Sequence, residues 1–155
     1  MLLAGMAPLA WSQQSNDGAL SVRITPDGNY SIGLPGSATA ALTSGVAAEV
    51  DGHWLHSSDY PHHKATHSTS HGILGEAEEW QVTWTGSKSR PDLSYELLAY
   101  SGKPFVEIQV TVHNGAGSAF HIEAIRSIDA AGAYPDLDGP AAEDRVLSDS
   151  FSEDR

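Results

Sequence analysis

The sequence predicts an all-β protein built as an antiparallel β-sandwich. Three runs, at residues 94–100, 105–112 and 120–125, place an apolar side chain at nearly every second position, which is the period of a strand with one buried face. Segments rich in glycine, proline and asparagine separate the runs, and such segments mark tight turns. A helix would scatter the same side chains around its surface. The three runs are therefore expected to form one antiparallel β-meander.

The region before this meander contains further strand patterns. Apolar and polar residues alternate in residues 20–24 and 30–34, and the turn-forming sequence Pro26-Asp27-Gly28-Asn29 lies between them, so a hairpin is predicted. Residues 38–50 are rich in small side chains, but their threonines and valines favour a strand over a helix. This strand is expected to carry a bulge at Gly45.

A separate alternating run covers residues 78–85. Trp80, Val82 and Trp84 share one face of it and are expected in the core. Residues 54–71, which precede this run, are polar and show no sustained apolar period. They are predicted to form a solvated loop.

Length and charge limit the classes of protein that fit. With 155 residues the chain is long enough for one domain with a single core. Its 20 acidic residues against 8 Lys and Arg give a formal net charge of -12, which repels nucleic acids and anionic membranes. No cysteine is present, so disulfides, thiolate metal sites and cysteine nucleophiles are excluded.

The first residues have the character of an export signal. Residues 2–10 are apolar but too short to span a bilayer, and Ala10 and Ser12 are small residues suited to cleavage after Ser12. No Lys or Arg precedes the apolar run, which departs from the usual signal pattern. We expect residues 1–12 to be a signal peptide, residues 13–155 to form the sandwich, and the protein to be secreted or periplasmic without a membrane span.

The last third of the sequence loses its regular period. Residues 129–140 are rich in glycine and proline and are predicted to be a loop, whereas residues 145–151 are predicted to be one more strand. No closing turn or polar tail follows in the sequence. The sandwich is therefore expected to be incomplete at its C-terminus.

Two groups of side chains suggest metal binding, but for both groups a solvated loop without a metal ion is the preferred interpretation. His63, His67 and His71 would share one face of a helix, but the Ser and Thr residues between them disfavour helix, so no metal site is expected. Asp136-Leu137-Asp138-Gly139 begins like a calcium loop, yet Glu143 comes too early to be its final ligand. A solvated acidic loop is the preferred interpretation there.

The sequence lacks the motifs of hydrolases with a catalytic triad and of nucleotide-binding enzymes. It contains no Gly-x-Ser-x-Gly, phosphate loop or dinucleotide fingerprint, so no catalytic residue or cofactor is assigned. Sugar-binding surfaces stack pyranose rings on exposed aromatic side chains. Trp54, Asp59 and Tyr60 lie in or beside the predicted loop and are our candidates for substrate binding. Core packing is the alternative role for these aromatic residues.

Several of these segments together resemble the N-terminal β-sandwich of bacterial α-galactosidase-like glycoside hydrolases, the melibiase group. They are Glu78-Glu79-Trp80, Leu97-Leu98-Ala99-Tyr100 followed by residues 102–108, the hairpin through Asn114-Gly115, and Leu147-Ser148-Asp149-Ser150-Phe151-Ser152. The resemblance covers residues 20–155 and rests on strand patterns. In that family a (β/α)8 barrel follows the sandwich and carries both catalytic aspartates. The resemblance thus implies a super-sandwich fold without catalytic residues.

Two hypotheses about function follow. The first is a non-catalytic N-terminal part of an exported glycoside hydrolase, which shapes or covers the sugar pocket of a barrel in the full-length protein; by similarity, residues 54–71 would approach that pocket. The second is a free-standing module that binds a carbohydrate, such as a galactoside, through Trp54 and Tyr60. An immunoglobulin-like structural domain fits the strand number but lacks the Cys, Trp, Cys spacing.

Overall fold

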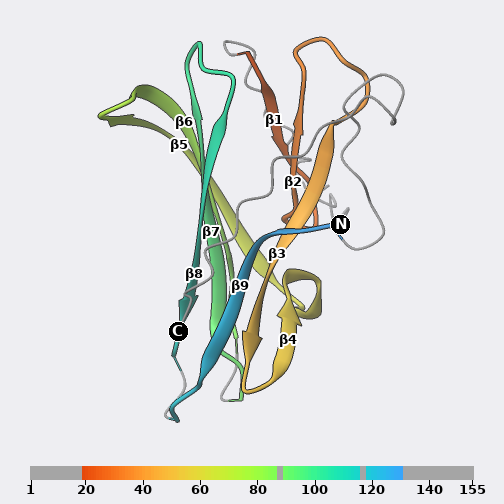
Figure 1. Ribbon diagram of the computed structural model, residues 1–155, viewed down its shortest axis with the longest axis vertical. Helices are drawn as coiled ribbons and strands as arrows, with labels where there is room; N and C mark the ends of the chain where they lie inside the picture. Colours follow the sequence, from red (N-terminus) through yellow and green to blue (C-terminus); the bar gives the residue numbers. More distant parts are fainter. Residues whose placement is uncertain (1–18, 87–88, 116–117, 131–155) are drawn as a thin grey trace, which may run out of the picture.

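A computed structural model describes residues 19–86, 89–115 and 118–130 of the chain (Figure 1). Four predictions made above lie wholly or largely outside these residues. They are the export signal at residues 1–12, the loop at residues 129–140, the acidic loop at residues 136–139 within it, and the strand at residues 145–151.

Within the described residues the chain forms nine strands and one short 3-10 helix. In chain order they are β1 Ser21–Ile24, β2 Tyr30–Gly33, β3 Leu42–Val50, β4 His53–His56, η1 Ser57–Asp59, β5 His63–Gly72, β6 Gly75–Trp84, β7 Asp92–Tyr100, β8 Val106–His113 and β9 Ile122–Asp129.

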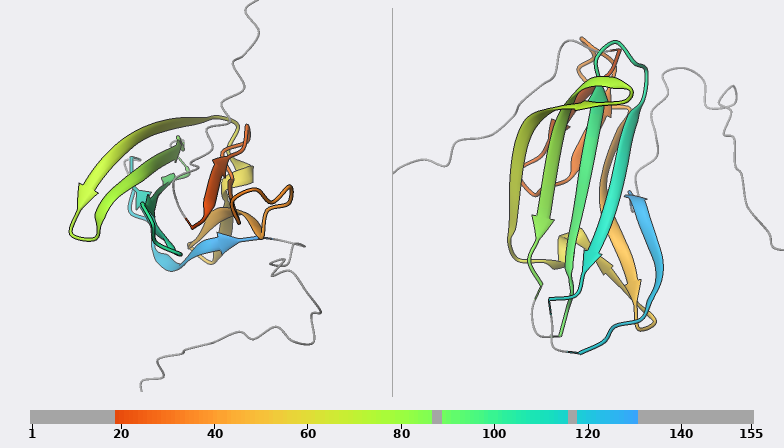
Figure 2. Two further views of the ribbon diagram at one scale, coloured as in Figure 1. Left: turned by 90° about the horizontal axis from the view of Figure 1, so that it is seen from above. Right: turned by 90° about the vertical axis from the view of Figure 1, so that its left-hand side faces the viewer.

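The strands form two sheets that pack face to face (Figures 1 and 2). One sheet has the order β1-β2-β3-β4, with β9 also paired to β3, and the other is the meander β5-β6-β7-β8. Every pair of neighbouring strands is antiparallel. The predicted antiparallel β-sandwich is therefore confirmed.

The first hairpin and the predicted bulge are both present. Strands β1 and β2 pair from Ile24 with Tyr30 to Ser21 with Gly33, and Gly28 takes a positive φ of 85° in the turn between them. Strand β3 shifts register against β9 between Gly45 and Ala47. The turn between β1 and β2 is predictable from sequence because turn formation depends on residues that are neighbours in the chain.

The third run of the predicted meander is paired differently from the prediction. Strands β7 and β8 pair as expected, but β9 leaves that sheet and pairs with β3, where Ile125 faces Ala48. The predicted single meander over residues 94–128 is therefore wrong at its third strand. Alternation shows that a strand has one buried face, and it gives no information on which of two facing sheets the strand joins.

The predicted polar loop at residues 54–71 is also wrong. These residues contribute to β4, to η1 and to the long strand β5, which pairs with β6 over its full length, from His63 with Trp84 to Gly72 with Gly75. The β5–β6 hairpin projects beyond the neighbouring strands (Figure 2). Most of β5 is exposed on both faces, so backbone pairing stabilises it and no apolar alternation appears in its sequence.

The core lies between the two sheets and is centred on β3, β6 and β7. Trp80, Val82 and Trp84 are buried, as their alternation predicts. Two buried tyrosines link the sheets: the rings of Tyr30 and Tyr95 meet edge to face at 5.6 Å. Their hydroxyls donate to backbone oxygens, Tyr95 to Gly28 and Tyr30 to Ser127 of β9. These bonds satisfy the polar groups that burial would otherwise leave unpaired.

Candidate functional site

A connected group of polar side chains lies on the outer face of β4, β3 and β9. Val46 and Ala48 of β3 point into the core, so Gly45 and Ala47 point outward. On this face His56 of β4 and Arg126 of β9 both pair with Ala47, and Asp129 of β9 pairs with Gly45. Because Gly45 and Ala47 have small side chains or none, long side chains of β9 can lie across β3 and reach β4.

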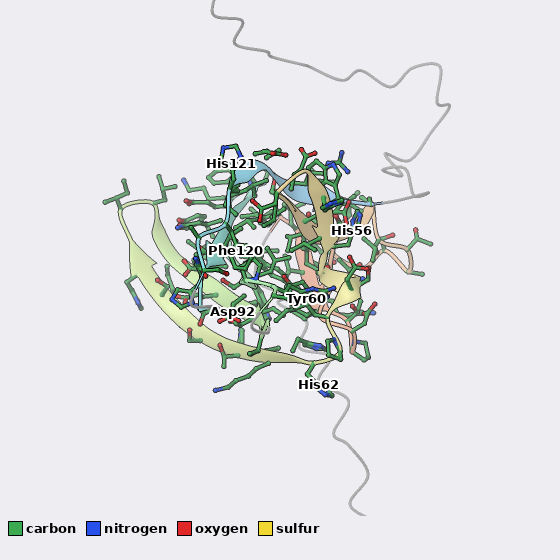
Figure 3. All side chains as sticks on the ribbon, turned by 90° about the horizontal axis from the view of Figure 1, so that it is seen from below. His56, Tyr60, His62, Asp92, Phe120 and His121 are labelled. Carbon is green, nitrogen blue, oxygen red and sulfur yellow. The ribbon has the colours of Figure 1, made fainter. Side chains whose placement is uncertain are left out.

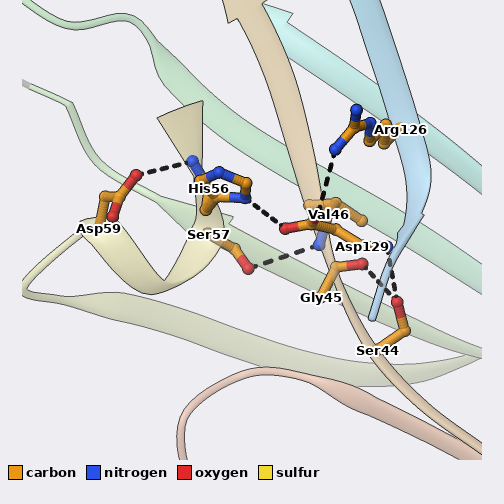
Figure 4. A network of polar contacts seen from close by, with 8 residues as sticks. All are labelled: Ser44, Gly45, Val46, His56, Ser57, Asp59, Arg126 and Asp129. Atoms are coloured by element: carbon orange, nitrogen blue, oxygen red, sulfur yellow. Dashed lines mark hydrogen bonds and ion pairs between the residues drawn. The ribbon is translucent and has the colours of Figure 1, made fainter. Parts of the chain in front are cut away.

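The first contact across β3 joins His56 to Asp129. The Nδ1 atom of His56 lies 2.6 Å from Oδ2 of Asp129, whose side chain is 11% exposed (Figure 4). The backbone N–H of Asp129 donates to Oγ of Ser44, and Ser44 in turn donates to the carbonyl oxygen of Gly45. These contacts attach the last residue of β9 to both β3 and β4.

The second contact across β3 places a cation on an aromatic ring. The guanidinium carbon of Arg126 lies 3.7 Å from the centroid of the half-exposed Trp54 ring, which is cation–π geometry. Nη1 of Arg126 also lies 3.8 Å from Oδ1 of Asp129. Trp54, His56, Arg126 and Asp129 thus form one continuous group, which we call the Trp54 surface.

The sequence-predicted substrate-binding residues have different positions. Trp54 lies on the Trp54 surface, and Asp59 lies beside it, where its Oδ2 accepts the backbone N–H of His56 at 2.8 Å. Tyr60 is in the core, 7% exposed, and donates its hydroxyl hydrogen to the carbonyl oxygen of Pro91. The expectation that the Tyr60 ring is exposed is therefore wrong.

Tyr60 is buried because it follows η1 in the link that crosses from β4 of one sheet to β5 of the other, and there it packs with the core cluster. In the view of Figure 3 Tyr60 lies within the sandwich, whereas His62 and His121 lie at its periphery. Burial raises the pKa of Tyr60 to about 12; Arg90, stacked on its ring at 5.0 Å, opposes this shift, and Asp92 and Asp59 add to it. A buried ring cannot act as a stacking platform for a sugar.

The histidines of β5 line one face of that strand. His67 lies 5.0 Å from the Trp80 ring, and its Nε2 is 2.5 Å from Oε2 of Glu78. Residues four apart in a strand are separated by about 13 Å, too far to bind one ion. Among the described residues, no group of three His, Cys, Asp or Glu side chains is arranged to hold a metal ion.

A second distinctive surface lies where β8 and β9 border each other (Figures 1 and 2). Among the described strands, β8 pairs only with β7, and β9 pairs only with β3. Three isoleucines of β9 are exposed here, Ile122 by 38%, Ile125 by 49% and Ile128 by 55%. The apolar inner side chains of β8 are only partly buried, from Val106 to Val112. We call this surface the β8–β9 side.

Sequence reasoning missed both Arg126 and Asp129 as members of a site. Their contacts with β4 cross about seventy residues of sequence, since His56 and Asp129 are 73 positions apart. The only local signal for this arrangement is the pair of small residues, Gly45 and Ala47, on the outer face of β3.

Comparison with known proteins does not assign a family. No protein-family model matches the chain, and no similar protein was found among curated proteins or solved structures. In the part of the chain that the structure describes, no helix is long and apolar enough to cross a membrane.

Proposed function

We propose that this chain is the non-catalytic β-sandwich part of an exported glycoside hydrolase of the α-galactosidase-like group. In that role it shapes or covers the sugar pocket of a catalytic barrel in the full-length protein. The sequence resemblance supplies the enzyme group, and the surfaces of the sandwich supply the physical support.

The observation that carries this proposal is the exposed apolar β8–β9 side. Ile122, Ile125 and Ile128 follow one another along β9, beside a strand edge that no other described strand occupies. Contiguous exposed apolar residues of this kind mark surfaces that other parts of a protein cover. An accessory domain of a larger enzyme needs such a surface, whereas an independent module is better served by a polar one.

The Trp54 surface supports contact with a carbohydrate. It combines an indole ring with the N–H groups of Arg126 and the imidazole of His56, all held on a sheet. Aromatic faces and charged hydrogen-bonding groups are the features that orient sugars in binding sites. Arg126 covers one face of the Trp54 ring, so a sugar would contact the other face or the edge of the indole.

Sequencing the coding DNA beyond the codon for Arg155 tests the proposal. We expect an open reading frame of several hundred codons in which strand and helix patterns alternate, as a barrel requires. A stop codon directly after Arg155 would contradict the proposal.

A free-standing carbohydrate-binding module is the second candidate, and the partial exposure of Trp54 on a rigid sheet favours it. Titration of the purified chain with α-galactosides, followed by isothermal titration calorimetry, separates the two. An accessory domain is expected to show no saturation below about 10 mM, which corresponds to less than about 3 kcal/mol of binding free energy. Saturable binding that is lost in Trp54→Ala and kept in His53→Ala, a change in the same strand, would favour the module.

A further inference from the structure

The chain leaves the end of β8 through Asn114 and Gly115. Both residues are exposed, and they directly follow His113, the last residue of that strand. The Nδ2 group of Asn114 donates to the carbonyl oxygen of Ser118 at 2.8 Å. The backbone N–H of Gly115 donates to the carbonyl oxygen of His113 at 3.1 Å, and it lies beyond the last pair of β7 with β8. The side-chain amide of Asn114 is therefore followed by a backbone nitrogen outside the sheet.

A histidine and a carboxylate lie beside this backbone nitrogen. Nδ1 of His113 is 3.5 Å from Oδ2 of Asp92. A Cβ atom built on Gly115 would lie 3.8 Å from that carboxylate oxygen and 3.9 Å from Nδ1 of His113. The His113 side chain is 72% exposed, so water reaches it. An imidazole held by a carboxylate can accept a proton directly or through one water molecule.

We propose that Asn114 is a site of spontaneous deamidation, and that the pair of His113 and Asp92 assists by accepting the amide proton of Gly115. The Gly115 nitrogen attacks Cγ of Asn114, which forms a succinimide ring, and the bond from Cγ to Nδ2 breaks. The proton passes to Nδ2, which leaves as ammonia. Water then opens the ring at either carbonyl carbon, so position 114 becomes aspartate or isoaspartate. This inference goes beyond the proposed function and does not depend on it.

The residue that follows each asparagine decides whether the attack is possible. Gly115 has no Cβ atom, so its backbone can approach the side chain of Asn114 with little steric hindrance. Asn29 provides a contrast within the described residues. It is followed by Tyr30, which is fully buried and belongs to β2, and its Nδ2 group donates to Oδ2 of Asp27. Asn29 is therefore expected to keep its amide.

The modification would change the link between the two sheets. Strand β8 belongs to the meander and β9 to the other sheet, so the chain crosses from one sheet to the other after Asn114. An ionised carboxylate has no N–H to donate to the carbonyl oxygen of Ser118, so the contact at 2.8 Å is lost. Isoaspartate also inserts a side-chain carbon into the backbone. Each converted molecule thus loses a contact at the start of this link.

Incubation of the purified chain in neutral buffer, followed by peptide mapping with mass spectrometry, tests the proposal. Aspartate and isoaspartate are expected to accumulate at position 114 while Asn29 stays intact. Gly115→Ala should slow the conversion about tenfold, because a methyl group restricts the approach of the nitrogen. The methyl group would meet only ordinary contacts and Gly115 has no positive φ, so the fold is retained. An intact Asn114, or an unchanged rate in Gly115→Ala, would overturn the proposal.

Two histidine variants test the role of the base. The side chains of His113 and His121 are similarly exposed, by 72% and 77%, and His121 lies near Glu123 instead of Asp92. His113→Gln should slow the conversion of Asn114 by about threefold or more. His121→Gln should keep the parent rate, and circular dichroism checks that both variants are folded. Conversion at the same rate in the two variants would overturn the assignment of His113 as the base.

Discussion

His56 on β4 and Asp129 on β9 meet across β3, with 2.6 Å between Nδ1 and Oδ2, although 73 residues separate them in the sequence. The contact is possible because the outer face of β3 carries only Gly45 and Ala47 at this level. It attaches β9 to a sheet that its predecessor β8 does not belong to. The contact between His56 and Asp129 thus reinforces the pairing of β9 with β3, and this pairing leaves β8 and β9 unpaired with each other.

Removal of this contact should weaken the fold modestly. His56→Ala leaves the nearly buried carboxylate of Asp129 with only the more distant Arg126, and it should lower the free energy of unfolding by about 1 kcal/mol, because His56 itself is one-third exposed. Urea denaturation measures the change. His53→Ala, an exposed site in the same strand, is the control and should stay within about 0.5 kcal/mol of the parent. Equal losses in both variants would show that the contact is not stabilising.

The packing around Gly45 on the outer face of β3 leaves no room for a side chain. A Cβ atom there would lie 2.5 Å from Oγ of Ser57 and 2.8 Å from Oδ1 of Asn29. Gly45→Ala should therefore lower the free energy of unfolding by about 1–3 kcal/mol. Gly72→Ala in β5 places a methyl group in open space and should be neutral or stabilise by about 0.5 kcal/mol. Thermal unfolding followed by circular dichroism compares them, and equal midpoints would contradict the packing described for Gly45.

The two faces of β7 should respond differently to truncation of leucine. Leu97 is fully buried between the sheets, whereas Leu98 points to the opposite face and is half-buried. Leu97→Ala should cost about 2–5 kcal/mol of unfolding free energy through lost burial and a cavity, and Leu98→Ala about 1 kcal/mol. Chemical denaturation of both variants gives the difference. A larger loss for Leu98 would mean that the sheet presents its other face to the core.

The buried tyrosines predict unfolding at alkaline pH. Burial raises the pKa of Tyr30 and Tyr95, and it raises that of Tyr60 to about 12, from an ordinary value of 10.0. Because the folded-state pKa lies above the unfolded one, these groups contribute stability that is fully present below pH 10 and is lost as pH rises through about 12.

Tyrosinate absorbance and circular dichroism, recorded together in a pH titration, check this prediction. Ionisation of the buried tyrosines should coincide with loss of the β-sheet signal. Titration of every tyrosine near pH 10 with the sheet signal intact would contradict the burial of Tyr60 and its neighbours.

The fold class was predictable because the core strands carry their own signal. The alternation of Trp80, Val82 and Trp84 in β6 identifies a buried face without knowledge of any partner. Strand β5 gives no such signal, since its side chains are mostly exposed and its stability depends on pairing with β6. Exposed edge strands are for this reason poorly predicted from sequence.

The candidate site was only partly predictable for a related reason. Trp54 and Asp59, chosen because they lie in or beside the predicted polar loop, both lie at or beside the Trp54 surface. Tyr60 follows them directly but lies in the core, because the link after η1 crosses from one sheet to the other at this point. Arg126 and Asp129 reach the site only through the pairing of β9 with β3, which alternation cannot specify.

The central claim is that β9 pairs with β3 and not with β8, which leaves an apolar border for further chain to cover. Nuclear Overhauser spectroscopy of the labelled protein tests it most directly. We expect backbone cross-peaks between facing residues of β3 and β9, such as Ala48 with Ile125 or Glu49 with Ala124. A ladder of backbone cross-peaks between β8 and β9 would instead show a continuous meander and contradict the account.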